Sequence, residues 1–120
     1  MKAQLIVAAD MKMASGRTYP RDILQKALDT SVGAYVVESV DSHFPLVIDI
    51  TKIGGTFRSY DIADDGNVTV ELEMFTNDMG LKLRAMIEAG AKLDINAIGS
   101  IDEDQVVTKI VMIKSFYPTL

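Results

Sequence analysis

The order of strand-like and helix-like segments constrains this chain most. Seven segments are rich in β-branched and aromatic residues or alternate apolar with polar residues, and only two repeat apolar residues at helical spacing. The clearest strand is 68–75, where every second residue from Val68 to Met74 is apolar, as expected for a half-buried strand. Short polar turns join most of the strands, which favours antiparallel pairing. The order β-α-β-β-β-β-α-β-β predicts an α+β fold, a mostly antiparallel sheet or barrel with two helices. The strand-like segments are 4–9, 34–40, 46–53, 56–62, 68–75, 92–101 and 105–116.

Both helices are predicted with defined ends. The first begins at Pro20, because the first helical turn needs no backbone donor there, and it stops at Gly33. The second is capped by Thr76 or Asn77 and closes at Gly90. The apolar positions expected to face the core are Ile23, Leu24, Ala27 and Leu28 in the first helix and Met79, Leu83, Met86 and Ile87 in the second.

Glycine-containing sequences mark the turns. Gly54-Gly55 indicates a hairpin or a β-bulge, and the run 64–67 (DDGN) is a strong turn signal. The aspartates of this turn and Asp61 lack the spacing and the terminal glutamate of a calcium loop, so we interpret them as a solvated turn. The segment 105–116 carries apolar residues on both faces, which predicts a central strand.

Composition excludes several classes of function. The 120 residues suffice for a single domain, 1–120. There is no cysteine and only one histidine, which excludes disulfides, thiol catalysis and thiolate or histidine-rich metal sites, so we expect no metal and no cofactor. With 12 Lys and Arg against 17 Asp and Glu, the net charge of −5 disfavours a nucleic-acid partner. No apolar run approaches the roughly 20 residues that span a bilayer. The N-terminus also lacks a full signal-peptide core, so we expect an intracellular protein with no membrane partner.

His43 is the residue with the most evident catalytic chemistry. It lies in the polar turn 41–45 (DSHFP), and a histidine can act as a general base when a nucleophile lies within hydrogen-bond reach. No candidate serine lies in a G-x-S-x-G elbow, although Ser100 follows Gly99 near a strand end. An exposed turn histidine is therefore the simpler interpretation. The candidate serines are Ser15, Ser31, Ser39, Ser42, Ser59, Ser100 and Ser115.

The segment 15–27 (SGRTYPRDILQKA) resembles a motif of tailed-phage prohead maturation proteases, N-x-R-x-Y-P-x-x-[IV]-L-x-x-A. The positions that match are Arg17, Tyr19, Pro20 and Leu24. This family shares a serine-protease fold with the herpesvirus assemblins. The resemblance therefore implies an α+β domain of the prohead-protease or assemblin type.

Two further segments follow in the family's order. Residues 40–45 (VDSHFP) stand where the family has its G-E-L-x-H-P turn, which places His43 at the family's base position. Residues 77–90 stand where the family has the helix D-x-G-x-x-L-x-x-x-I-x-x-G. The resemblance therefore covers nearly the whole chain.

The chain departs from the family at the nucleophile. After that helix the family has G-[VI]-S-S-R-G, which contains the catalytic serine, whereas this chain reads DINAIG at 94–99. Asn96 and Ala97 stand at the serine positions, and Ile98 replaces the arginine. Neither an amide nor a methyl group can attack a carbonyl, so the covalent route is lost. Ile98 also removes a cation that would help to bind the oxyanion.

The resemblance and this departure together imply a protease-like fold without protease activity, that is, a pseudoenzyme. We expect a binding module in phage head assembly: a scaffold component, a minor head protein, a capsid decoration or a partner of an active protease. Its partners would be phage capsid or scaffold proteins, and exposed strand edges would support a homo-oligomer. It would act in the host cytoplasm and in the virion head. Met11 and Met13, in the loop before Arg17, are adaptable contact candidates, although ordinary loop packing also explains them.

Two alternatives stay open. In the first, the chain is an active serine protease with Ser100 as a displaced nucleophile and His43 as its base. Ser100 lies four residues from Asn96. On a strand this is roughly 13 Å at about 3.3 Å per residue, so the site would have to be rebuilt. In the second alternative, the chain is an unrelated α+β protein-binding domain whose motif matches arise by chance.

Overall fold

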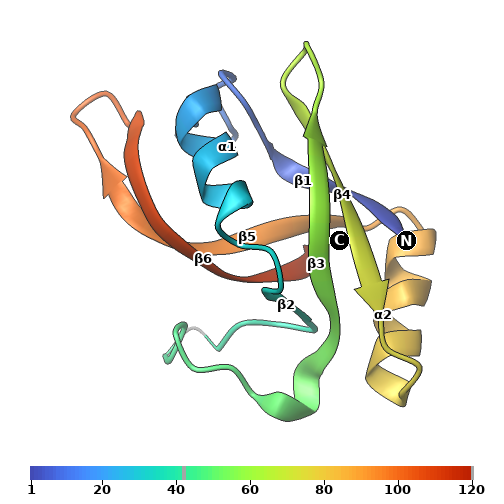
Figure 1. The fold of residues 1–120 in the computed structure, drawn as a ribbon. Coiled ribbons are helices and arrows are strands. Elements are labelled where there is room, and N and C mark those ends of the chain that lie inside the picture. The colour runs from blue at the N-terminus through green and yellow to red at the C-terminus, as the bar shows by residue number, and fades with distance from the viewer. Residues whose placement is uncertain (42, 120) are drawn as a thin grey trace.

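The computed structural model describes residues 1–41 and 43–119 (Figure 1). Over these residues the chain forms six strands and two α-helices. In chain order the elements are β1 (Lys2–Ala8), α1 (Arg21–Asp29), β2 (Tyr35–Val37), a 3-10 turn (Ile50–Lys52), β3 (Ile53–Ile62), β4 (Asn67–Met74), α2 (Asp78–Glu88), β5 (Lys92–Ile101) and β6 (Val107–Thr119). Within the described ranges, neither helix has the length and hydrophobicity needed to cross a bilayer.

The strands close into one barrel in the order β1-β4-β3-β2-β6-β5. Four neighbouring pairs are antiparallel, and the β1·β5 and β2·β6 pairs are parallel. Both parallel pairs are short, with Leu5 opposite Leu93 in one and Val36 opposite Phe116 in the other. The predicted α+β fold, a mostly antiparallel barrel with two helices, is therefore confirmed.

The barrel interior holds the hydrophobic core. Side chains of β4 alternate between the interior and solvent, so Val68 and Val70 are fully buried while Thr69 is exposed. Phe57 of β3 and Phe116 of β6 meet inside, with their ring centroids 4.9 Å apart. Burial of an apolar side chain of this kind contributes about 1.5–3 kcal/mol.

Each helix packs one apolar face onto the barrel. This face includes Leu24 and Leu28 in α1 and Leu83 in α2, and all three side chains are fully buried. The Asn77 side-chain oxygen accepts a hydrogen bond from the backbone N of Gly80 at 2.8 Å. Asn77 is therefore the N-cap of α2, as one of the two predicted capping residues.

The first helix is expected to continue to Gly33, but its last helical residue is Asp29. Thr30 Oγ1 and Ser31 Oγ donate hydrogen bonds to the carbonyl oxygen of Ala27 at 3.1 and 2.5 Å. In a continued helix this oxygen would accept the backbone N–H of Ser31. The hydroxyl groups therefore compete with the next helical turn, which the sequence pattern did not indicate.

The predicted strand 46–53 is wrong for most of its length. Residues 46–49 lie outside regular secondary structure, a 3-10 turn follows, and β3 begins only at Ile53. Asp49 Oδ1 accepts hydrogen bonds from the backbone N of Thr51 at 2.9 Å and from its Oγ1 at 2.6 Å. Local side-chain bonds of this kind compete with strand pairing, so an alternating pattern here belongs to a loop.

Gly54 and Gly55 lie inside β3. The register between β2 and β3 shifts at this point, so the predicted bulge is confirmed and the alternative of a hairpin turn is wrong. A Cβ atom on Gly54 would lie 2.5 Å from Cδ1 of Leu83 and 3.0 Å from the carbonyl oxygen of Met79. The glycine thus permits α2 to cross β3 at a very short distance.

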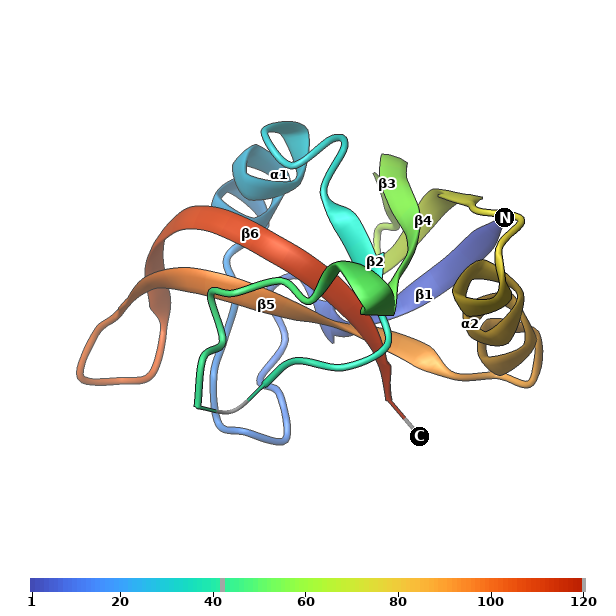
Figure 2. The same cartoon turned by 90° about the horizontal axis from the view of Figure 1, so that it is seen from below.

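Strands β5 and β6 form a long ribbon whose tip, residues 102–106, stands at one extreme of the molecule (Figures 1 and 2). Their pairing has three register shifts, which bend and twist the ribbon. β6 lies between β2 and β5, but in a closed barrel every strand has two neighbours, so this position does not distinguish β6 as a central strand. Beyond the short β2·β6 pairing, α1 lies alongside β6 (Figure 2).

Candidate functional site

The loop that joins β2 to β3 carries His43, and we name it the His43 loop. It lies across the outer face of β5 and β6 (Figure 2). The backbone N of His43 donates a hydrogen bond to Asp41 Oδ1 at 2.8 Å, which closes a local turn. The side chain of His43 is exposed. An exposed histidine in a turn is what the sequence predicted at this position.

Asn96, on β5, is bonded to the His43 loop. Its side-chain Nδ2 donates a hydrogen bond to the carbonyl oxygen of Pro45 at 2.5 Å, across 51 residues of sequence. Pro45 is two residues from His43. The fold therefore brings together the two segments in which the resemblance places a serine and a histidine, and an asparagine amide connects them.

Ser115, on β6, is paired with Asn96 in the β5·β6 register, so both side chains lie on the same face of the ribbon. Only 1% of Ser115 is exposed, because the His43 loop covers it with residues such as Pro45 and Val47. The sequence indicated Ser115 only as one serine among seven. Ser115 differs from the other serines in lying opposite Asn96 on the neighbouring strand. That position depends on the bulged register of the two strands.

A second polar pair extends the same face. Asp94 and Tyr117 are opposite each other, one alternation away from Asn96, and the Tyr117 hydroxyl donates a hydrogen bond to Asp94 Oδ2 at 3.2 Å. Burial raises the pKa of Tyr117, and the charge of Asp94 and the hydrogen bond to it raise it further. The phenol is therefore held as a neutral donor. The sequence motifs did not identify this pair, although the alternation of Asp94 with Asn96 is visible in the sequence.

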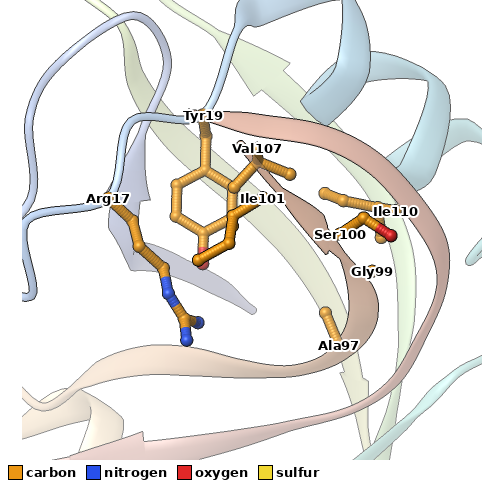
Figure 3. A pocket seen from close by; sticks show the side chains of 8 residues that line it. All are labelled: Arg17, Tyr19, Ala97, Gly99, Ser100, Ile101, Val107 and Ile110. Atoms are coloured by element: carbon orange, nitrogen blue, oxygen red, sulfur yellow. The ribbon is translucent and has the colours of Figure 1, made fainter. Parts of the chain in front are cut away.

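The Arg17 motif lines a separate cleft of about 190 Å³ (Figure 3). Its walls include Arg17 and Tyr19 from the loop before α1 and Ala97, Gly99 and Ser100 from β5. In Figure 3 the Tyr19 ring lies beside Arg17, and the Ser100 hydroxyl points away from the Arg17 guanidinium. Among the residues that the structure describes, Arg17 forms no ion pair, so its charge is available at the cleft.

The expected site residues thus divide between two places. Ala97 and Ser100 lie at the Arg17 cleft, whereas Asn96 bonds to the His43 loop. His43 is absent from the part of the cleft lining that the structure describes. In the same described ranges, no hydrogen bond joins the His43 imidazole to a serine hydroxyl. The fold therefore does not assemble a Ser100–His43 pair.

Pro20 and Leu24 contribute to the framework instead. Pro20 is the N-cap residue of α1, so the predicted start of this helix is confirmed within one residue, and Leu24 is fully buried. Thr18 bridges to Lys12 and to Val106, which docks the motif segment against the start of β6. The roles of Pro20 and Leu24 in the motif are therefore structural.

Arg21 fixes the loop before α1 on the barrel. Its backbone N donates to Asp10 Oδ1 and its Nη2 donates to the carbonyl oxygen of Ala63, both at 2.9 Å. The turn after β3 is formed as predicted, with Gly66 at a φ of 95°. A Cβ atom on Gly66 would lie 2.3 Å from the carbonyl oxygen of Ala9, so the two segments pack closely.

A comparison with solved structures identifies the fold. The structure of the bacteriophage T4 capsid assembly protease, gp21, superposes on this chain with a TM-score of 0.69 and 18% sequence identity, covering 99% of this chain and 81% of that chain. No protein-family model matches the sequence, and no curated protein matches it by sequence. The chain therefore has the prohead-protease-like fold that the sequence resemblance implied, and the alternative of an unrelated α+β fold does not agree with this likeness.

Proposed function

We propose that this chain is a non-catalytic, protease-like module of phage head assembly. The hydrogen bond from Asn96 Nδ2 to the Pro45 carbonyl oxygen carries the proposal. The resemblance leads us to expect a nucleophile at position 96, where this chain has an amide. That amide bonds the His43 loop to β5. An amide nitrogen has no lone pair free to attack a peptide carbonyl.

The neighbouring hydroxyl groups support the same proposal. Ser115 lies beside Asn96, but it is covered by the His43 loop and a polypeptide cannot reach it there. Ser100 is exposed, but it lines the Arg17 cleft. Acyl transfer needs a nucleophile within hydrogen-bond reach of its base, and neither serine has this arrangement with His43.

The competing function is an active serine protease that uses Ser100 and His43. Intact-mass spectrometry of the purified protein, with and without a fluorophosphonate probe for reactive serines, separates the two. We expect neither an adduct nor self-cleavage over days of incubation. An adduct or a cleavage product that disappears in Ser100→Ala would overturn the non-catalytic proposal.

We further propose that the module acts by binding phage capsid or scaffold proteins, in the host cytoplasm and in the virion head. The likeness to a capsid assembly protease supports this class of partner. The net charge of −5 is unfavourable for a polyanion, so the proposal includes neither nucleic acid nor membrane as a ligand.

Co-sedimentation tests this role. The purified chain is mixed with proheads assembled from the capsid and scaffold proteins of the phage that encodes it, and the pellet is analysed for stoichiometry. We expect a fixed ratio of this chain to capsid protein, unchanged by His43→Ala because binding needs no base. Failure to sediment with proheads, and with scaffold alone, would contradict the proposal.

A further inference from the structure

A groove runs between α1 and β6. Its apolar lining includes Ile23 and Ala27 from α1 and Ile110 and Val111 from β6, and its volume is about 440 Å³. Val111 is 60% exposed, so much of its apolar side chain is free to be covered by another molecule. No residue of the His43 loop lines this groove among those that the structure describes. The lining of the groove is more apolar than that of the Arg17 cleft.

Two lysines flank this groove. Lys26 lines it from α1, and Lys109 lines it from β6. Four ion pairs form among the described residues, and neither lysine takes part in them. Unpaired cations on both sides of an apolar floor, in a chain with a net charge of −5, favour a ligand that carries carboxylates.

The tip of the β5–β6 ribbon carries such carboxylates in the consecutive residues Asp102, Glu103 and Asp104. Asp102 Oδ1 accepts hydrogen bonds from the backbone N of Asp104 at 2.8 Å and of Val106 at 3.0 Å, so the turn is pre-formed. Glu103 and Asp104 are exposed, and within the described ranges they form no ion pair. Their carboxylates are therefore available to another molecule.

The tip joins β5 to β6, and β6 also forms one wall of the groove. Asp104 lies in the turn at the tip and Lys109 lies on β6, and within the described ranges no ion pair joins them. A two-fold axis that places the tip of one copy in the groove of a second copy also places the tip of the second copy in the groove of the first. Both contacts are then made at once and the assembly closes as a dimer.

We propose that the groove between α1 and β6 binds the acidic tip of a second copy of this chain, forming a symmetric dimer. Glu103 and Asp104 of each copy lie against Lys26 and Lys109 of the other, and Val111 is covered in the interface. The pre-formed turn limits the entropy lost on binding. Because the attraction between charges is screened by ions, the dimer weakens as salt is added.

Sedimentation velocity over a concentration series tests the proposal. We expect a reversible monomer–dimer equilibrium at low ionic strength. The groove variant Lys26→Glu/Lys109→Glu and the tip variant Glu103→Lys/Asp104→Lys each replace attraction by repulsion at both contacts. We expect each variant alone to raise the dissociation constant at least about tenfold.

An equimolar mixture of the groove variant and the tip variant distinguishes this interface from others. In the mixture, each reversed surface meets a complementary one, so we expect a heterodimer with an affinity close to that of the original chain. A chain that carries all four substitutions should also dimerise. The residues are exposed, so circular dichroism and melting temperature should confirm that every variant is folded.

Charge-matched controls exclude a general effect of net charge. Arg84→Glu/Lys92→Glu and Asp61→Lys/Glu88→Lys change exposed residues outside the groove and the tip, and we expect each to leave the dissociation constant within about twofold. A chain that stays monomeric at every concentration would overturn the proposal. A dimer that the groove variant does not weaken would overturn it too, as would capture of a different acidic protein without self-association.

Discussion

The region where α2 packs on the barrel and the His43 loop are held in different ways. Around α2, Leu83 is fully buried, and Gly54 leaves no room for even a Cβ atom. On the His43 loop, Val47 is 67% exposed and Ile50 is 81% exposed, and the side chain of Asn96 bonds the loop to β5. Close packing holds the first region, whereas polar contacts hold the second.

This difference indicates which parts of the chain can change without loss of the fold. A close-packed region loses stability with almost any change in side-chain volume. A loop held by a few hydrogen bonds tolerates substitution, because most of its side chains are in water. A TM-score of 0.69 at 18% identity shows that this fold is kept under extensive substitution.

The largest expected loss of stability comes from a substitution in the packed region around α2. Leu83→Ala should lower the free energy of unfolding by about 2–5 kcal/mol, because it removes a fully buried side chain and leaves a cavity. Urea denaturation measures this change. Leu81→Ala is the matched control, since Leu81 is 55% exposed on the same helix and its loss should change stability by less than about 1 kcal/mol. An unchanged midpoint for Leu83→Ala would show that this side chain does not fill the core in solution.

A smaller loss should follow from adding a single methyl group to α2. In Gly80→Ala the new Cβ atom would lie 2.0 Å from the carbonyl oxygen of Phe75, a backbone atom that cannot rotate away. We expect a loss of about 1–3 kcal/mol, although helix propensity alone favours alanine by about 1 kcal/mol. Differential scanning calorimetry of Gly80→Ala beside wild type decides between these signs. A raised melting temperature would show that propensity outweighs the close contact.

Asn96→Ala removes the hydrogen bond from β5 to the His43 loop and should cost only about 0.5–1.5 kcal/mol, the usual net value of one hydrogen bond. Its main effect should be local: amide hydrogen exchange should accelerate in the His43 loop and remain unchanged in β3 and β4. The exposed His43 offers a comparison, and His43→Ala should stay within about 0.5 kcal/mol of wild type. Equal acceleration across the whole barrel in Asn96→Ala would contradict a purely local role.

The smallest effect concerns alkaline pH. Burial, and then the hydrogen bond and the charge of Asp29, raise the pKa of Tyr60 to about 12. The folded state therefore holds this proton more tightly than the unfolded chain, whose tyrosines titrate near about 10. The stability linked to this proton is complete below about pH 10 and is lost as pH rises toward about 12.

Denaturation of wild type and Tyr60→Phe on either side of the unfolded tyrosine pKa, at about pH 9 and about pH 11, measures this dependence. The variant should lose less stability between the two pH values, and Tyr117→Phe, which removes a second phenol with a raised pKa, should reduce the loss by a smaller amount. A steeper loss in Tyr60→Phe than in wild type would show that the folded state does not hold the Tyr60 proton more tightly.

The elements that sequence predicted well are those decided by nearby residues. The alternation in β4, the N-cap at Asn77 and the turn at Gly66 each depend on residues within one element or one turn. The fold class follows from these elements and their order. The motif that begins at Arg17 then indicated which α+β fold this is.

The features that sequence missed depend on residues far apart in the chain. The sequence predicts a bulge or a hairpin at Gly54-Gly55, but the close contact of Gly54 is with Leu83, 29 residues later. Asn96 was recognised as a substitution, but its bond to Pro45 spans 51 residues. The β5–β6 ribbon has three register shifts, and each one changes which residues lie opposite each other. The pairing of Asn96 with Ser115 could therefore not be predicted from their separation in the sequence.

The two parallel seams of the barrel impose an order on its biosynthesis. β1 cannot pair with β5 until Leu93 has been synthesised. Val36 of β2 likewise cannot pair until Phe116, near the end of β6, has been synthesised. No closed barrel can therefore exist before β5 and β6 have been synthesised. The nascent chain therefore exposes unpaired strand edges until both strands have been made, and such edges can pair with other chains.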